Sequence, residues 1–332
     1  MYTLDTTDCF RITPTSDTYI YDIIPTEKGI VTISSDNSLR LLDPLALNTP
    51  LNTIKNVNAE ITCATVIRGD GESSSLVGTA GRDGKLTLID FRCQKIGEIS
   101  TQGNAAILAL ASFGNAIAAG TELTNHQASV IMWDARNLSA PVVEYVESHS
   151  DDVTEVQFHP SRPQILLSGS TDGLLNIYDT TVSDEEDALH QTINHGHSIH
   201  RCNFLNDADI FALSHDEQFS LYELMTDVGE GIEEPAAVSF GDMRELLGGE
   251  YAANVVRRTD GSAVLGIGSH SRESFDLIQL RKHSSWNFVP EERVNLTGAH
   301  GSEIVRSFCF MDSHKTVLTA GEDGQVKAWG SE

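Results

Sequence analysis

Acidic residues recur along this chain at a spacing that could support acid–base chemistry. In the stretch STDGLLNIYD, residues 170–179, Asp172 and Asp179 flank a short apolar run, and two nearby carboxylates can act as general acid and general base. A turn acid followed seven residues later by a strand end recurs at four other places: Asp36 and Asp43, Asp83 and Asp90, Asp216 and Glu223, and Asp323 and Gly330. An Asp beside a Gly also suits the tight turn between two strands. The recurrence favours turn residues over repeated active sites, so no catalytic residue is predicted.

A histidine-rich stretch, HGHSIH at residues 195–200, could bind a metal ion. Its three histidines are close in sequence to Cys202, and His and Cys are common zinc ligands. However, His197 stands 19 residues before Asp216, where a structural loop histidine belongs in the repeat described below. The sequence also has no GxSxG, P-loop or HExxH motif. We therefore expect no metal, no cofactor and no enzymatic activity.

The strand-end residues mark an internal repeat. They lie at positions 43, 90, 134, 179, 223, 279 and 330, so successive copies are 44 to 56 residues apart. WD-type β-propellers repeat at about 40–45 residues, with four strands in each blade. The repeat predicts an all-β fold: a single seven-bladed WD40 β-propeller that spans residues 1–332 as one domain.

Alternating apolar runs between turn residues predict the strands of each blade. In the fourth blade they place strands a to d at residues 153–160, 165–171, 174–179 and 190–196. The chain ends directly after strand c of the seventh blade, which would leave a sheet edge open. Residues 2–13 are β-like and otherwise unassigned, so we expect the N-terminus to close the ring as the missing strand.

Two blades carry the residues of a buried hydrogen-bond network. In propellers of this type, a loop His bonds to the turn Asp, to a Ser or Thr and so to the aromatic residue of strand c. The matching residues, with 23 positions from His to Asp, are His149, Asp172 and Tyr178 in blade four and His300, Asp323 and Trp329 in blade seven. Blade one has Leu42 in the aromatic position and no matching His. We therefore expect Asp36→Ala to destabilise the protein less than Asp323→Ala.

These repeats resemble a known family. The stretch HSDDVTEVQFHPSRPQILLSGSTDGLLNIYD, followed by DEEDAL, SHDEQF, IVRSFCF and TAGEDGQVKAW, is similar to the WD repeat-containing protein 89 family. The resemblance covers most of the chain and is closest in blades four, five and seven. It implies an intracellular seven-bladed scaffold without established catalytic residues.

The charge balance limits the partners that the chain can bind. It has 22 Lys and Arg against 48 Asp and Glu, a formal net charge of −26. Nucleic acids and anionic membranes attract clustered basic residues, so we expect neither as a direct partner. An acidic surface instead steers a basic protein or peptide towards itself, although it could serve solubility alone.

The cysteines and the N-terminus indicate a cellular compartment. Five scattered cysteines form no CxxC pair, which is typical of a reduced intracellular protein. The first residues, MYTLDTTDCFRIT, do not resemble a secretory signal. We expect a monomer in the cytoplasm or the nucleus.

Acidic loops form the first candidate partner-binding site. A propeller places its a–b and c–d loops on one face, so the c–d loops of blades four and five should cluster with the a–b loop at residues 206–209. The c–d acids are Asp184, Glu185, Glu186, Asp187, Asp227, Glu230, Glu233 and Glu234. The opposite face, around the channel, is the second candidate, with Asp151, Asp152, Glu217 and Glu322. We expect a basic nuclear or ribosomal client at one of these faces.

An alternative hypothesis is a substrate receptor of a cullin-type ubiquitin ligase. It rests on an Arg two residues after a strand-end Asp: Trp133, Asp134 and Arg136 in blade three, and Asp90 and Arg92 in blade two. Both resemble the WDxR box by which some propellers join ligase adaptors. Both are incomplete, because blade three has Gln127 in place of the turn Asp and blade two has Ile89 in place of Trp. A surface Arg that caps a strand end also explains them.

Overall fold

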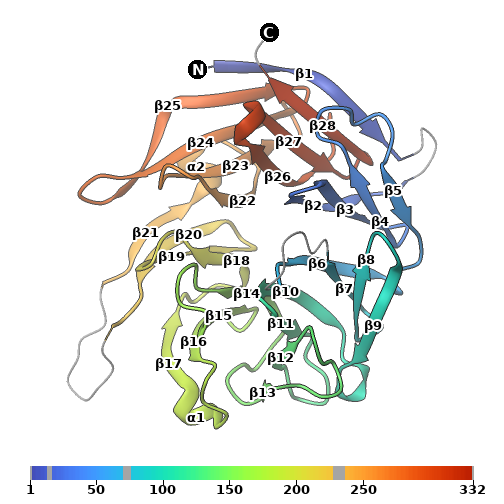
Figure 1. Cartoon of the computed structure of the whole chain (residues 1–332). Coiled ribbons are helices and arrows are strands. Elements are labelled where there is room, and N and C mark those ends of the chain that lie inside the picture. The colour runs from blue at the N-terminus through green and yellow to red at the C-terminus, as the bar shows by residue number, and fades with distance from the viewer. Residues whose placement is uncertain (1, 13–16, 70–75, 227–235, 331–332) are drawn as a thin grey trace. The chain divides into compact units, whose positions relative to one another are not determined.

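Antiparallel strands make up most of the computed structural model, which describes residues 2–12, 17–69, 76–226 and 236–330. The predicted all-β fold is confirmed, because the strands form four-stranded meanders of the propeller-blade type (Figure 1). Contacts divide the chain into two compact units: Asn58–Asp242, and Met1–Val57 together with Met243–Glu332.

The unit Asn58–Asp242 contains blades two to five, each a sheet of four consecutive strands. Blade two consists of β6 (Ile61–Ile67), β7 (Leu76–Gly81), β8 (Lys85–Asp90) and β9 (Gln94–Ser100). Blade three consists of β10 (Ile107–Phe113), β11 (Ala116–Thr121), β12 (Val130–Asp134) and β13 (Val143–Tyr145). Blade four consists of β14 (Val153–Phe158), β15 (Ile165–Ser170), β16 (Leu174–Asp179) and β17 (Leu189–Asn194), with the short helix α1 (Glu185–Ala188) before β17. Blade five consists of β18 (Ile199–Phe204), β19 (Asp209–Ser214), β20 (Gln218–Glu223) and β21 (Val238–Asp242). The strands predicted for blade four are confirmed to within two residues.

The other unit contains blade one and an eight-stranded sheet. Blade one consists of β2 (Ile20–Thr26), β3 (Gly29–Ser34), β4 (Ser38–Leu42) and β5 (Asn52–Ile54). Blade six, which follows the helix α2 (Met243–Leu247), consists of β22 (Tyr251–Arg257), β23 (Ala263–Ser269), β24 (Ser274–Lys282) and β25 (Trp286–Thr297). Blade seven consists of β26 (Val305–Met311), β27 (Thr316–Gly321), β28 (Gln325–Gly330) and the N-terminal strand β1 (Tyr2–Arg11).

The N-terminal strand supplies the missing edge of blade seven, as predicted. β1 pairs antiparallel with β28, from Asp5 opposite Gly330 to Arg11 opposite Gln325. Its first residues also pair in parallel with β25, with Tyr2 opposite Val294, which the sequence did not predict. β1 therefore joins blades six and seven into one sheet (Figure 1).

An extended hairpin in blade six explains this second pairing. The ladder between β24 and β25 jumps from Leu277 opposite Val294 to Gln279 opposite Val289, so residues 290–293 bulge out of it. The extra residues lie in the interval between positions 279 and 330, which at 51 residues is the second longest of the repeat. Beyond the bulge, the outer edge of β25 is paired with β1.

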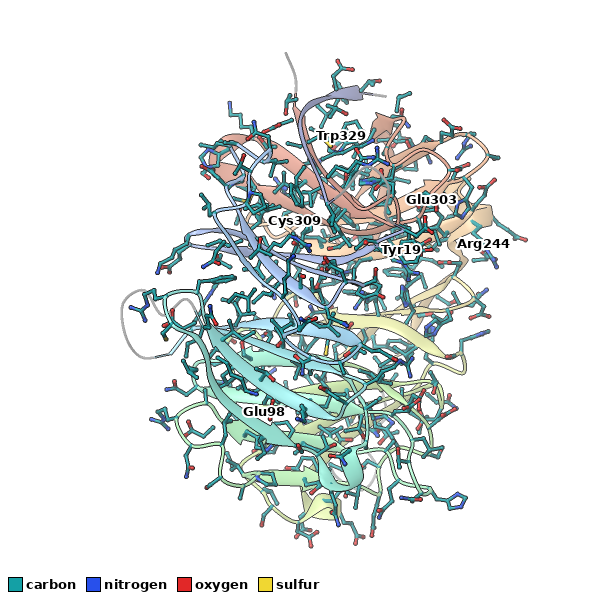
Figure 2. All side chains as sticks on the ribbon, turned by 90° about the vertical axis from the view of Figure 1, so that its right-hand side faces the viewer. Tyr19, Glu98, Arg244, Glu303, Cys309 and Trp329 are labelled. Carbon is teal, nitrogen blue, oxygen red and sulfur yellow. The ribbon has the colours of Figure 1, made fainter. Side chains whose placement is uncertain are left out.

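The hydrophobic core lies between successive sheets of each unit. In the unit Asn58–Asp242, Ile177 of blade four packs in one cluster with Phe204 of blade five. In the other unit, Phe10 of β1 clusters with Ile30 of blade one and with Cys309 of blade seven, which is labelled in Figure 2. Strand residues alternate between such clusters and the opposite face because successive side chains of a strand point to opposite sides.

Candidate interaction site

The recurring turn acids shape the turns between strands b and c. Asp172 Oδ1 accepts the Leu174 N–H at 2.9 Å, and Asp323 Oδ1 accepts the Gln325 N–H at 3.0 Å. The residue after each acid has positive φ, for example 86° at Gly173 and 69° at Gly324, a backbone conformation that favours glycine. These carboxylates therefore serve the turns.

The predicted hydrogen-bond chain is present in blade four. His149 Nδ1 lies 3.0 Å from Asp172 Oδ2, and its Nε2 lies 2.7 Å from Ser168 Oγ. Ser168 Oγ in turn lies 3.4 Å from the Tyr178 hydroxyl. Burial is the largest effect and opposes ionisation of Asp172, but the hydrogen bond and charge of His149, together with the N–H groups of Ser150 and Leu174, outweigh it and lower the pKa of the carboxyl. Because Ser168 is fully buried, no substrate reaches its hydroxyl.

In blade seven the chain of hydrogen bonds is longer. His300 Nδ1 lies 2.6 Å from Asp323 Oδ1, and its Nε2 lies 2.7 Å from Thr319 Oγ1, which also accepts the Trp329 indole N–H at 2.9 Å. On the other side, Gln325 Nε2 donates to Asp323 Oδ2 at 2.6 Å, and the Cys9 thiol donates to Gln325 Oε1 at 3.0 Å. The network thus extends into β1, which also pairs through Thr6 with Trp329, labelled in Figure 2.

Blade one uses an arginine where other blades use the loop histidine. Arg40 of β4 is 6% exposed, and it donates to Asp36 Oδ2 at 2.5 Å and to Ser34 Oγ at 2.6 Å. Asp36 therefore has a buried partner even though blade one has no matching histidine. The signal that sequence reasoning missed is an Arg inside an otherwise apolar strand, four residues after a turn acid.

Blade two uses an asparagine in the same role. Asn58 Oδ1 accepts the Thr79 hydroxyl at 2.7 Å, and Asn58 Nδ2 donates to the Lys85 carbonyl at 2.9 Å. Asn58 Nδ2 also lies 3.4 Å from Asp83 Oδ1. Asn58 precedes the turn acid Asp83 by 25 residues, close to the spacing of the two loop histidines, which was the available signal.

Blade three lacks the hydroxyl of the network. Trp133 is 2% exposed, and its Nε1 has no hydrogen-bond partner among the described residues. The residue two positions after its cross-strand partner Ile117 is Ala119, whereas the same register holds Ser168 in blade four and Thr319 in blade seven. The buried indole N–H is unpaired because an alanine replaces the acceptor.

The two WDxR-like sites share one geometry. Arg136 Nε donates to Asp134 Oδ1 at 2.9 Å, and its Nη2 donates to Asp134 Oδ2 at 2.5 Å. Arg92 holds Asp90 in the same way, at 3.0 and 2.5 Å. Both guanidiniums fold back on their own Asp, yet the Arg side chains stay 68% and 69% exposed. The hydrogen bonds from Arg136 lower the pKa of Asp134 to about 2.

Blade five divides the histidine role between two residues. His197 Nδ1 lies 2.8 Å from Asp216 Oδ2, in an exposed pair. His195 is buried with its Nδ1 2.8 Å from the Tyr222 hydroxyl, and its Nε2 has no partner within hydrogen-bond geometry in the part of the chain that is described. Burial, followed by the neighbouring His197, lowers the pKa of His195 to about 4.

No metal centre emerges from this stretch or elsewhere in the described ranges, where no three His, Cys, Asp or Glu residues are grouped so as to hold an ion. Within the same ranges, the structure has no helix of the length and apolar character needed to cross a membrane.

Glu185 is the organising residue of the blade four acidic loop. Its carboxylate accepts the N–H groups of Val146 at 2.6 Å, Glu147 at 2.9 Å and Ser148 at 2.7 Å, and the Ser148 hydroxyl also donates to it. These donors belong to the connection between blades three and four. The structure therefore makes Glu185 a loop anchor, and its role as a contact residue stays a prediction. It also brings Glu147, which sequence reasoning missed, next to α1.

The other predicted loop acids differ in their surroundings. Asp184 caps α1 by accepting the Asp187 N–H at 3.3 Å, while Glu186 and Asp187 are exposed. In the a–b loop of blade five, Asp207 is exposed but Asp209 is buried and accepts from Asn206 at 2.5 Å. The predicted site residues Asp227, Glu230, Glu233 and Glu234 lie outside the described residues.

The predicted channel-face acids are partly buried and engaged within the chain. Asp152 Oδ1 accepts the Leu123 N–H at 2.8 Å, which links blade four to blade three. Asp151 Oδ1 accepts the Asp152 N–H at 2.9 Å, and Glu322 accepts from Arg306 Nε at 2.8 Å. Glu217 follows a turn acid and has a positive φ of 68°. These acids are therefore less available to a partner than Glu186 and Asp187.

Comparison with known proteins agrees with these networks and blades. The family model "WD domain, G-beta repeat" matches residues 141–179 and 292–330, which hold the His149 and His300 networks. An uncharacterized WD repeat-containing protein of Saccharomyces cerevisiae is 35% identical over 317 residues, 95% of this chain and 79% of the relative. One of Schizosaccharomyces pombe is 30% identical over 329 residues, 96% of this chain and 97% of the relative.

A relative named WD repeat-containing protein 89 homolog, from Dictyostelium discoideum, is 28% identical over 187 residues, 55% of this chain and 50% of the relative. It carries the name of the family that the repeats resemble. With two relatives matched over nearly the whole chain and strands folded into blades, this chain belongs to the WD repeat-containing protein family.

Proposed function

We propose that this protein is a non-catalytic scaffold that binds a basic protein client, nuclear or ribosomal, through the acidic surface of blades four and five. WD repeat proteins serve as interaction scaffolds and are typically not catalysts. The cytoplasm and the nucleus are the compartments that we propose for it.

The observation that carries this proposal is the distribution of charge. Between Arg136 and Arg244 the sequence contains 21 acidic residues but only two basic ones, Arg162 and Arg201, so this stretch holds −19 of the total charge of −26. Arg201 Nη1 is already paired with Glu155 at 3.1 Å. Arg162 Nη2 donates to the Asp207 backbone carbonyl at 3.0 Å. Such a one-signed surface speeds the approach of a partner of opposite charge.

Three carboxylates beside the Glu185 anchor are free to meet a partner. Glu147, Glu186 and Asp187 are exposed, and their carboxylates make no hydrogen bond or ion pair with any residue that the structure describes. We call these three residues the acidic ledge. Lysine and arginine side chains of a client could pair with the ledge without displacing an existing interaction.

Charge reversal of the acidic ledge tests the proposal. The variant Glu147→Lys, Glu186→Lys, Asp187→Lys and the control Glu245→Lys, Glu291→Lys, Glu303→Lys both change the net charge from −26 to −20. The control residues are likewise exposed. The ledge variant should bind a lysine-rich peptide more slowly and with a flatter salt dependence. The control should show a far smaller decrease in the association rate. Equal losses would show that only the overall charge matters.

The paired WDxR-like sites support a second candidate function, as a receptor of a cullin-type ligase. Arg92 and Arg136 present their guanidiniums in the same fixed geometry on two neighbouring blades. If a ligase adaptor binds there, Arg92→Ala with Arg136→Ala should abolish its recovery in affinity purification, while the acidic-ledge variant should retain it. Absence of an adaptor from the wild-type sample would count against this candidate.

A further inference from the structure

We propose that Ser183, in the loop between β16 and α1, is a phosphorylation site for an acidophilic protein kinase, and that its phosphate strengthens binding of the basic client. The effect of the phosphate on client binding rests on the proposed function, whereas the phosphorylation site itself does not.

The sequence around Ser183 has the charge pattern that such a kinase requires. Residues 184–187, Asp-Glu-Glu-Asp, occupy the four positions after Ser183. Protein kinases select substrates partly by such charge patterns, and a basic substrate groove would favour this segment. An acid three positions after a serine or threonine is found at eight residues of the chain: Thr87, Ser148, Thr181, Ser183, Ser214, Ser220, Ser239 and Thr319.

The structure separates Ser183 from the other seven. Four of the eight are buried inside sheets: Thr87, Ser214, Ser220 and Thr319. The Ser148 hydroxyl donates to Glu185, and the Thr181 hydroxyl donates to Asp179 at 2.6 Å. Ser239 is exposed, but its backbone pairs with Ser220 in the ladder of β21.

Ser183 has what a kinase active site needs from its substrate. It is exposed, lies outside any helix or strand, and its hydroxyl has no hydrogen-bond partner in the described ranges. A kinase that binds residues 181–187 must release the short helix α1 and the Glu185 anchor, but it does not have to open a sheet. In the transfer, Ser183 Oγ forms a bond to the γ-phosphorus of ATP, the bond from that phosphorus to the β-phosphate oxygen breaks, ADP leaves, and the hydroxyl proton passes to the kinase base.

The charge of the surrounding chain determines what the phosphate can do. It adds about −1.5 to −2 charges at pH 7, beside the acidic ledge. Phosphates often act within a protein by pairing with an Arg cluster, but the stretch between Arg136 and Arg244 contains only Arg162 and Arg201, both of which are engaged. The phosphate therefore acts outward, on a basic partner.

The phosphorylation itself is tested with the full chain, an acidophilic serine kinase, Mg-ATP and mapping by mass spectrometry. We expect phosphate on Ser183, absent from Ser183→Ala and retained in the matched control Ser239→Ala. Glu186→Gln, which removes the acid three positions after the serine, should slow incorporation several-fold. Glu147→Gln, which neutralises a nearby acid outside the segment, should leave the rate unchanged. Failure to modify Ser183, or equal modification of Ser239, would overturn the assignment.

The consequence for binding is measured on the same samples with a lysine-rich peptide. Phosphorylated wild-type protein should bind it more tightly than unmodified protein, with a gain that disappears at high salt, and kinase-treated Ser183→Ala should show no gain. Phosphate on Ser183 without a gain would overturn the second half of the inference. If the unmodified chain binds no peptide, the proposed function fails, while the mapped phosphate still supports the modification site.

Discussion

Trp329 donates its indole N–H to Thr319 Oγ1 at 2.9 Å, and this hydroxyl also bonds to His300 Nε2 at 2.7 Å. The alcohol thus completes the hydrogen bonding of two buried side chains. Blade three has the donor without the acceptor, because Ala119 occupies the register of Thr319 and leaves Trp133 Nε1 unpaired among the described residues. A buried unpaired donor costs about 1–3 kcal/mol.

Ala119→Ser should therefore stabilise the protein. The new hydroxyl can accept the Trp133 N–H, and we expect the free energy of unfolding to rise by about 0.5–1.5 kcal/mol, measured by chemical denaturation. Ala118→Ser is the matched control, since Ala118 is equally buried but belongs to a cluster on the opposite side of β11 that does not include Trp133. It should destabilise. A similar decrease in the free energy of unfolding in both variants would contradict the view that Trp133 lacks only an acceptor.

The buried ion pair of blade one gives a second prediction. Asp36→Ala leaves the guanidinium of Arg40 without its carboxylate, and breaking a fully buried pair costs roughly 3–5 kcal/mol. Because the Asp36 side chain is 31% exposed, we expect a somewhat smaller loss, comparable to that of Asp323→Ala. The double variant Asp36→Ala, Arg40→Leu should recover much of the stability. A double variant less stable than Asp36→Ala would show that the unpaired guanidinium of Arg40 is not what destabilises Asp36→Ala.

The networks also show what the sequence could predict. Repeat period and turn chemistry are local properties, so the blades, the turn acids and the closing strand could be predicted from it. The roles of Arg40 and Asn58 could not be predicted in this way. Both side chains make the hydrogen bonds that the loop histidine makes in other blades, but they are different residue types. Glu185 was read as a surface acid for a related reason: its three N–H donors lie about 38 residues away in the chain, and only the fold brings them together.

The N-terminal strand should contribute through two separable pairings. Deletion of residues 2–11 removes the ladder to β28 and the hydrogen bond from Cys9 to Gln325, and it should expose a sheet edge that promotes aggregation. Deletion of residues 2–4 removes only the parallel pairing with β25 and should cause a much smaller decrease in melting temperature. Hydrogen exchange of residues 325–330 should rise in the longer deletion alone. Unchanged exchange there would mean that β1 does not protect β28.

Stability should fall as the pH decreases from about 6.5 to about 4, because burial lowers the folded-state pKa of His195 from its ordinary value of about 6.5 to about 4. In this window the unfolded chain binds a proton at His195 that the folded chain does not, so protonation favours unfolding. Carboxyls with lowered pKa, such as Asp172 and Asp323, lose their contribution at lower pH, below about 4. His195→Asn should therefore flatten the dependence between about pH 4 and 6.5. The control His283→Asn, on an exposed turn, should leave the slope intact, and an unchanged slope in His195→Asn would refute the assignment.

Glu185 should prove to be a structural anchor, in contrast to its neighbour Glu186. Glu185→Ala leaves the N–H groups of Val146, Glu147 and Ser148 without their acceptor, although water can reach the exposed Glu147. We expect a loss of about 1–3 kcal/mol and faster amide exchange across residues 146–148. Glu186→Ala, which removes the same charge from the same helix, should change neither quantity but should slow the binding of a lysine-rich peptide. Glu185→Gln keeps one carbonyl acceptor and should fall between the two in stability. If Glu185→Ala instead keeps wild-type stability and exchange while peptide binding falls as far as in Glu186→Ala, Glu185 is a contact residue after all.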